Sequence, residues 1–262
     1  MSHFSVLVIT DSESNEDILY DMLAPYDENL EVPEYVCKTK SELAEYYKDF
    51  LQKWYEDCLK TENKESVEKA AELKAKLDSF TDEDSIIKAY KEDHAGSMFD
   101  EDDNLLTTYN PDSKYDWHVV GGRFSGALRL KNGDTVDEAF AEEIDFEIDP
   151  EEYKENIRWW ELAVEEQQPK EGEKPPFVYY RKEYYLDRYK DKETFAKIMS
   201  RPTFYAVVTK AGVWHSKGEM GWFACSSETA DESLDWDLNF FERFIQPAID
   251  NNDYLTVVDC HI

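Results

Sequence analysis

Cysteines are few in this chain, and their spacing is not that of a disulfide framework or a zinc site. The 262 residues include four, Cys37, Cys58, Cys225 and Cys260, which lie far apart with no Cys-x-x-Cys pair. Disulfide-stabilised domains and structural zinc sites both need clustered cysteines. We therefore expect four reduced thiols.

Long apolar runs are also absent. No stretch approaches the roughly 18 apolar residues that a membrane-spanning helix requires. The opening residues, MSHFSVLVIT, have no basic segment and only a short apolar run, unlike a secretory signal peptide. These features predict a soluble protein of the cytoplasm.

Basic residues are scarce relative to acidic ones. Lys and Arg number 29 against 60 Asp and Glu, which gives a net charge of −31. Such a surface repels nucleic-acid phosphates and anionic lipids, so we expect neither direct nucleic-acid binding nor membrane binding. Two interpretations of the acidity stay open. It serves solubility, or its carboxylates take the places of phosphates and compete with nucleic acid for another protein's basic groove.

Familiar catalytic and cofactor motifs are missing. The sequence has no P-loop, Gly-x-Gly-x-x-Gly, Gly-x-Ser-x-Gly, His-Glu-x-x-His or zinc-deaminase signature, so we expect no cofactor and no metal site. The acidic run Asp100, Glu101, Asp102 and Asp103 lacks the alternating ligands and the glycine of an EF-hand loop. It is instead predicted to be part of the acidic surface.

The apolar content is high enough for a substantial core, at 41% hydrophobic and 15% aromatic residues. Short apolar, β-branched runs predict strands. These runs are 4–10, 34–38, 115–120, 124–130, 204–209, 212–215, 221–225 and 254–260. Apolar positions three and four apart predict helices, one of them with Thr39 and Glu42 as a capping box. The predicted helices are 39–59, 65–77, one after Thr81, 150–168, 194–199 and 234–249.

Together these elements predict an α+β fold. We expect one mixed or mainly antiparallel sheet, built from N-terminal, middle and C-terminal strands and covered by helices on one face. Residues 1–262 are expected to form a single domain with helical insertions at about 40–95 and 150–199. An apolar strand at each end of the chain needs neighbours, so the first and last strands are predicted to lie inside the sheet, close together. A glycine-turn hairpin is expected to join 115–120 to 124–130, and a second hairpin around Lys210-Ala211 is expected to join 204–209 to 212–215.

Pairing of the end strands would bring His3, Asp259 and His261 together. Histidines beside a carboxylate can relay protons or bind metal, but they can equally be polar strand ends that face water. The loop Gly121-Gly122-Arg123 offers backbone N–H groups and a guanidinium to a phosphate. Arg123 is equally suited to anchoring a buried carboxylate such as Asp145.

A second glycine-bearing turn, Lys217 to Trp222, supplies further candidates. Glu219 is a possible acid or base, and Trp222 is a possible stacking surface, although tryptophans in such positions are more often core residues. The candidate ligand site thus comprises His3, Gly121, Gly122, Arg123, Glu219, Trp222, Asp259 and His261.

Several phrases in the chain resemble a known family. They are Ser2 to Ile9 (SHFSVLVI), Tyr109 to Lys114 (YNPDSK), Asp116-Trp117 followed by Gly121-Gly122-Arg123, Lys217 to Trp222 (KGEMGW) and Leu255 to Ile262 (LTVVDCHI). In these phrases the chain is similar to uncharacterised acidic accessory proteins of tailed bacteriophages. The resemblance implies action in the host bacterial cytoplasm, often against host defence, and supplies no catalytic residue.

Two functional hypotheses follow. The leading one is a non-enzymatic phage protein that binds and inhibits a basic host protein, such as a defence or nucleic-acid-handling factor, through its acidic and DNA-mimicking surface. The alternative is a nucleotide-ligand site, either a sponge for a signalling nucleotide or an enzyme acting on one, around Arg123, Trp222 and the paired chain ends.

Overall fold

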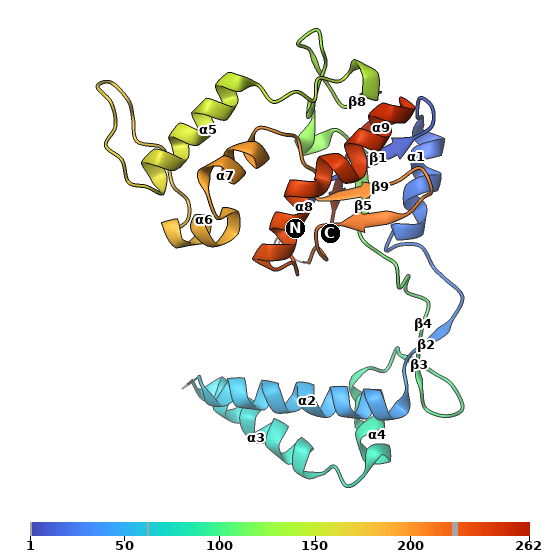
Figure 1. Ribbon diagram of the computed structural model, residues 1–262. Helices are drawn as coiled ribbons and strands as arrows, with labels where there is room; N and C mark the ends of the chain where they lie inside the picture. The colour runs from blue at the N-terminus through green and yellow to red at the C-terminus, as the bar shows by residue number, and fades with distance from the viewer. Residues whose placement is uncertain (1, 62, 222–224) are drawn as a thin grey trace. The chain divides into compact units, whose positions relative to one another are not determined.

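The computed structural model describes residues 2–61, 63–221 and 225–262 (Figure 1). The α+β prediction is confirmed, because a mixed six-stranded sheet carries packed helices. The chain divides into two compact units, unit 1 (Met1–Leu30 and Pro111–Ile262) and unit 2 (Glu31–Asn110). The single-domain prediction stays a prediction, since compactness alone does not show whether a unit folds independently.

Unit 1 contains the main sheet, in which the first and last strands are neighbours. Its strands are β1 (His3–Thr10), β5 (Trp117–Val120), β8 (Glu138–Phe140), β9 (Ala206–Val208), β10 (Trp214–Ser216) and β11 (Tyr254–His261). The order is β10-β9-β1-β11-β5, with β8 also paired to β11. β1 and β11 run antiparallel over their full length, from His3 opposite His261 to Thr10 opposite Tyr254. The predicted meeting of the chain ends is confirmed.

Helices cover both faces of this sheet, so the prediction of one covered face is wrong. On one face, Leu7 and Val257 pack under α8 (Ala230–Phe240), the π-helical η5 (Phe241–Ile245) and α9 (Gln246–Asn251) (Figure 1). On the other face, Val6 and Val258 pack against α1 (Glu16–Leu23). The signal was present in the continuous apolar runs of β1 and β11, because strands buried on both faces lose the alternation of polar and apolar residues.

The predicted hairpin at 204–215 is confirmed by the antiparallel pairing of β9 with β10, but the glycine-turn hairpin is wrong. β5 pairs with β11, and the chain turns at Gly121 into the short helix η2 (Gly122–Phe124). The next strand, β6 (Leu128–Arg129), pairs instead with β7 (Thr135–Val136). Paired glycines accept positive φ in many kinds of turn, so they do not specify a hairpin. The core of the strand predicted at 221–225 lies outside the described residues.

The remaining helices of unit 1 form a satellite cluster. They are α5 (Pro150–Ala163), α6 (Lys182–Tyr189) and α7 (Lys192–Met199), and the short segments η1 (Ala24–Tyr26) and η3 (Ala141–Glu143) also belong to this unit. Trp160, Val164, Tyr185 and Phe195 form the buried centre of the cluster. α6 was not predicted, because its aromatic residues do not repeat with a clear helical period.

Unit 2 combines a helical layer with a sheet of its own. Its elements are β2 (Tyr35–Lys38), α2 (Lys40–Leu59), α3 (Lys64–Asp78), α4 (Glu83–Asp93), β3 (Met98–Phe99) and β4 (Leu105–Thr107). The capping box predicted at Thr39 and Glu42 starts α2. The second predicted strand, 34–38, belongs to the small sheet β2-β4-β3 rather than to the main one. Among the described residues, no helix is both long and apolar enough to cross a bilayer.

Candidate functional site: paired histidines at the strand ends

Three aromatic rings form a cluster at the ends of β1, β11 and β5, and each ring contacts the other two, with His3 and Trp117 edge to face at 5.4 Å. His3 is opposite His261, and His261 is opposite Trp117. The His3 and His261 rings meet edge to face with centroids 4.9 Å apart, and Trp117 stacks on His261 at 5.1 Å. Side chains alternate along strands, so this ring cluster continues the face that carries Leu7 and Val257.

Each histidine of the ring cluster is hydrogen-bonded to its own carboxylate. His3 Nδ1 lies 2.8 Å from Asp259 Oδ1, and His261 Nδ1 lies 2.7 Å from Asp116 Oδ1. An ionised carboxylate can only accept, so Nδ1 carries the hydrogen in both pairs, and a neutral ring then keeps its lone pair on Nε2. Neither Nε2 is hydrogen-bonded to any part of the chain that the structure describes. We call these pairs the two His–Asp dyads.

The side chains of the dyads are largely buried but keep some exposure to solvent. The side chains of His3 and His261 are 10% and 7% exposed, and that of Asp259 is 2% exposed. Trp117, by contrast, is 44% exposed. Within the ring cluster, the two histidines are therefore largely buried beside their carboxylates, and Trp117 is the ring that a ligand can reach from solvent.

The glycine loop binds the protein's own carboxylates rather than offering an open phosphate cradle. The Arg123 backbone N–H donates to Asp259 Oδ2 at 2.9 Å, and the Gly126 N–H donates to Asp137 Oδ1 at 2.6 Å. Gly122 has φ +53°, and a Cβ placed there would lie 2.5 Å from Asp259 Oδ2. Glycine is required here because the loop must approach Asp259 this closely. The loop thus orients the Asp259 carboxylate, and through it His3.

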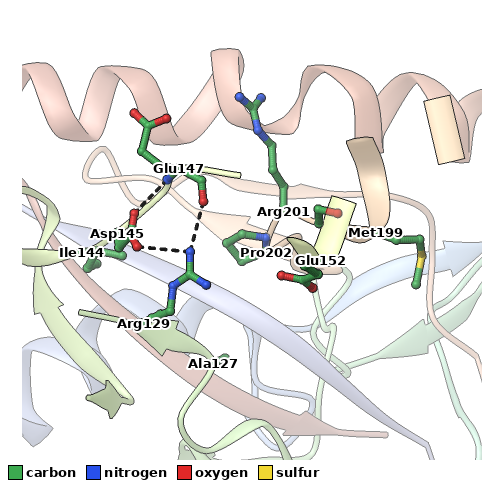
Figure 2. Close-up of a pocket in the computed structure, with 10 residues that line it drawn as sticks. Ala127, Arg129, Ile144, Asp145, Glu147, Glu152, Met199, Arg201 and Pro202 are labelled. Carbon is green, nitrogen blue, oxygen red and sulfur yellow. Dashed lines mark hydrogen bonds and ion pairs between the residues drawn. The ribbon is translucent and has the colours of Figure 1, made fainter. Parts of the chain in front are cut away.

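The Arg123 guanidinium is exposed and makes no ion pair with the described part of the chain. The prediction that it anchors Asp145 is wrong, because Asp145 Oδ2 lies 3.2 Å from Arg129 Nη2, and Arg129 also donates to the Glu147 carbonyl (Figure 2). These residues line a pocket of about 250 Å³, in which Arg129 is already paired with Asp145 and the Arg201 guanidinium lies over the Phe241 ring. Arg123 therefore remains available to an anion from solution.

The remaining candidates lie at the edge of this arrangement. Glu219 pairs with Lys114 at 2.9 Å, and its carboxylate is largely exposed. Ser2 Oγ donates to the Gly221 carbonyl at 3.0 Å, which ties the 217–221 turn to the start of β1. Trp222, which follows directly, lies outside the described residues.

The acidic loop does not present four free carboxylates. Asp103 pairs with Lys91 and Lys40, while Asp100 accepts hydrogen bonds from the backbone and side chain of Asn104. These bonds lower the pKa of both aspartates. Glu101 and Asp102 are exposed. Two of the four carboxylates of the loop are therefore engaged in hydrogen bonds or ion pairs within unit 2.

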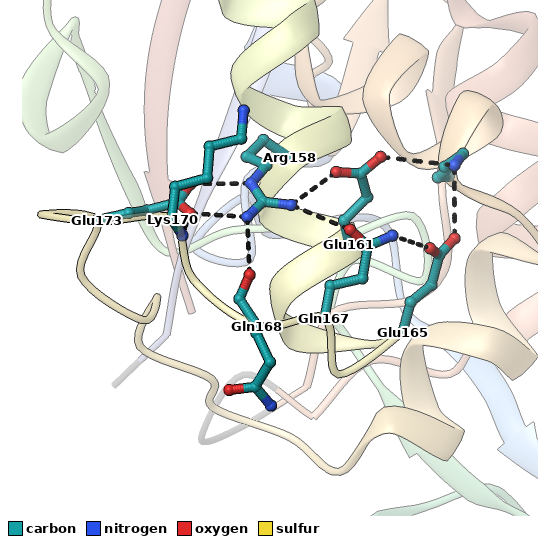
Figure 3. A network of polar contacts seen from close by, with 8 residues as sticks. Arg158, Glu161, Glu165, Gln167, Gln168, Lys170 and Glu173 are labelled. Carbon is teal, nitrogen blue, oxygen red and sulfur yellow. Dashed lines mark hydrogen bonds and ion pairs between the residues drawn. The ribbon is translucent and has the colours of Figure 1, made fainter.

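In another polar cluster, the guanidinium of Arg158 is hydrogen-bonded entirely within the chain. Arg158 makes a two-pronged contact with Glu173, at 2.9 and 2.7 Å, and also donates to Glu161 and Gln167 (Figure 3). Hydrogen bonds from Arg158 lower the pKa of Glu173 to about 2. This network fixes the loop after α5 and leaves no donor directed at a ligand, in contrast to Arg123.

Sequence reasoning found His3, Asp259 and His261 but missed Asp116 and Trp117. Both follow from the antiparallel pairing of β5 with β11, which places Trp117 opposite His261. The alternation along residues 115–120 was visible, but the neighbouring strand was not. Within the described ranges, no group of three or more His, Cys, Asp and Glu side chains is placed to hold a metal ion.

Chemically, the site combines two oriented imidazoles, an exposed aromatic face and an uncommitted guanidinium. One imidazole can accept a proton while the other donates one, which is the requirement of general acid–base catalysis. Searches with protein-family models, curated proteins and solved structures found no match to this chain.

Proposed function

We propose that the strand ends form a binding site for a small phosphorylated ligand of the nucleotide class, with the two His–Asp dyads as its acid and base. The observation that carries this proposal is that both histidines are oriented by buried or half-buried carboxylates through Nδ1. A purely structural polar pair would not need two such dyads in contact across adjacent strands.

Two neighbouring groups, Arg123 and Trp117, support this ligand class. Arg123 is a planar donor suited to phosphate oxygens, and it is exposed in a chain whose net charge would otherwise repel anions. Trp117 offers an exposed ring face on which a base can stack. A phosphate joined to an aromatic base matches both features.

The reaction that this geometry favours is cleavage of a phosphate ester. One neutral imidazole takes a proton from an attacking water, the new P–O bond forms, and the protonated imidazole of the other dyad gives its proton to the leaving oxygen as the old P–O bond breaks. Proton exchange with solvent restores both rings.

The test compares binding with turnover. A panel of linear and cyclic nucleotides is titrated by calorimetry and followed by ³¹P NMR. His3→Asn and His261→Asn keep a donor at the Nδ1 position but remove Nε2, so turnover should fall by about 10²- to 10⁴-fold while affinity changes little. Arg123→Ala should weaken binding by about 10- to 100-fold, and Arg181→Ala, which removes another exposed arginine, should not.

Two outcomes would overturn the proposal. One is the absence of binding by every nucleotide in the panel. The other is an affinity and a turnover that the Arg123 and histidine variants leave unchanged.

The acidic-partner hypothesis is a second proposal, in which the chain binds and inhibits a basic protein of the host bacterial cytoplasm. It is supported by how the cations are used, because many of the 29 Lys and Arg residues are in ion pairs within the chain, which leaves the acidic excess toward solvent. The internal pairing of Asp100 and Asp103 weakens the acidic loop as a DNA-mimicking element. A different surface of unit 2 suits a basic partner better.

A further inference from the structure

The outer side of α2 carries a row of exposed aromatic side chains. Tyr46, Phe50 and Trp54 are 51%, 47% and 41% exposed. They are four residues apart, so they lie along one side of the helix. The inner side of α2, with Leu43, Tyr47 and Leu51, is buried in the unit 2 core. We call Tyr46, Phe50 and Trp54 the aromatic row.

A line of carboxylates borders the aromatic row. Glu45, Asp49 and Glu56 follow one another at spacings of four and seven residues and lie about 100° around the helix from it. All three are exposed, and none makes an ion pair with the described part of the chain. Lys53 lies between the two lines, but it forms no ion pair with these carboxylates among the described residues. The three carboxylates of the acidic line therefore stay available to the cations of a partner.

The rings of the row already bind cations. Lys38 Nζ lies 4.8 Å from the centroid of the Tyr46 ring, and Lys69 Nζ lies 4.7 Å from that of Trp54. Aromatic faces attract ammonium and guanidinium groups, most strongly where water is excluded. The row can thus accept both apolar and cationic side chains.

Three exposed rings along a distance of about 12 Å form an apolar surface of the kind that marks an interaction site. We propose that this side of α2 is the docking site for a basic amphipathic helix of another protein. Its apolar side would cover the aromatic row while its Lys and Arg residues face the acidic line. The inference rests on the second proposal above, that the chain binds a basic partner.

Charge argues against the other occupants. A second copy of this chain would bring a net charge of −31 against the same acidic line. An anionic membrane would be repelled in the same way. A cationic amphipathic helix, by contrast, would be attracted by the carboxylates of the acidic line, and its apolar side would pack on the aromatic row.

The test uses the full chain and a defined probe. The probe is a Leu/Lys peptide of about 18 residues, or five helical turns, with one apolar and one basic side, and its control is a scrambled peptide of the same composition. Fluorescence anisotropy at about 0.15 M salt should show tighter binding of the amphipathic peptide.

Matched variants locate the surface. Phe50→Ser with Trp54→Ser should weaken binding by about tenfold or more. Phe177→Ser with Tyr179→Ser, which removes two rings that are 82% and 76% exposed elsewhere, should change it less than about twofold. Circular dichroism checks that each variant is folded, and Phe50→Ser alone serves if the double variant is not.

A second pair of variants tests the acidic line. Changing Glu45, Asp49 and Glu56 to their amides should weaken binding and flatten its salt dependence. The control removes the same charge from three exposed glutamates of unit 1, Glu142, Glu155 and Glu193. Equal losses in both would mean attraction by overall charge only, and would overturn the docking site.

The two proposals fail in different ways. If the amphipathic peptide binds no better than the scrambled one, and neither binds measurably, the basic-partner proposal fails together with this one. If the peptide binds but the α2 variants bind it as well as the native chain does, the docking site is wrong and the basic-partner proposal stands.

Discussion

The dyads in unit 1 and the aromatic row in unit 2 depart from ordinary burial in opposite directions. His3, Asp259 and His261 are polar and nearly enclosed, whereas Tyr46 and Trp54 are large, apolar and about half exposed. Apolar residues are usually buried and polar residues exposed, so a buried polar group or an exposed apolar group is an informative exception. Each deviation here coincides with a proposed site.

The difference between them is in what holds each region in place. The dyads are stabilised by their own hydrogen bonds, by the glycine loop and by the Trp117 ring, and removal of the Asp259 carboxylate would leave His3 Nδ1 and the Arg123 N–H without their acceptor. The aromatic row stands on a helix whose stability comes from its opposite side. Substitutions in the dyads should therefore lower the free energy of unfolding substantially, whereas substitutions in the aromatic row should change it little.

The largest expected effect on stability is that of Asp259→Ala. It removes the acceptor of both His3 and the Arg123 backbone N–H, so the free energy of unfolding should fall by about 2 to 4 kcal/mol. Urea denaturation measures this value. Asp235→Ala, at an exposed ion pair with Arg243, should change it by less than about 0.5 kcal/mol. Similar losses in both variants would contradict the assignment of Asp259 as the centre of the site.

A smaller loss is expected from Gly122→Ala. The new Cβ must adopt φ +53° and displace Asp259 Oδ2, which should cost about 2 to 3 kcal/mol. Gly133→Ala is the matched control, because Gly133 has φ +91° but no atom near its Cβ position. The difference between the two variants, again from urea denaturation, isolates the contact with Asp259. No difference would mean that the loop does not orient this carboxylate.

The smallest effect concerns pH. Burial lowers the pKa of His118, which lies beside Trp117 on the opposite side of β5. Just below the ordinary histidine pKa of 6.5, the unfolded chain takes up a proton that the folded chain does not. Stability from this group is therefore intact above that pH and declines as pH falls toward the folded pKa.

His118→Phe removes this component while keeping an aromatic ring against Tyr115. The variant should lose less stability than the native chain between neutral and mildly acidic pH, as measured by urea denaturation at both. An unchanged pH slope would show that His118 is not buried as the structure has it.

Local signals predicted local structure well. The α2 capping box at Thr39 and Glu42 needs only four consecutive residues, and the hairpin at 204–215 joins adjacent segments. The glycine loop failed as a hairpin because the partner of β5 is β11, more than a hundred residues away. The missed Asp116 has the same cause, since it reaches His261 only through that pairing.

The sequence by itself determined the charge, the period of each long helix and the apolar character of the end strands, because these depend on composition and on neighbours a few residues apart. From the end strands it also predicted that His3, Asp259 and His261 would meet. Only the tertiary structure decided which nitrogen of each histidine faces a carboxylate, that Trp117 covers His261, and that Arg123 has no ion-pair partner among the described residues. Those features depend on strand register and on backbone approach between distant segments, which no local pattern encodes.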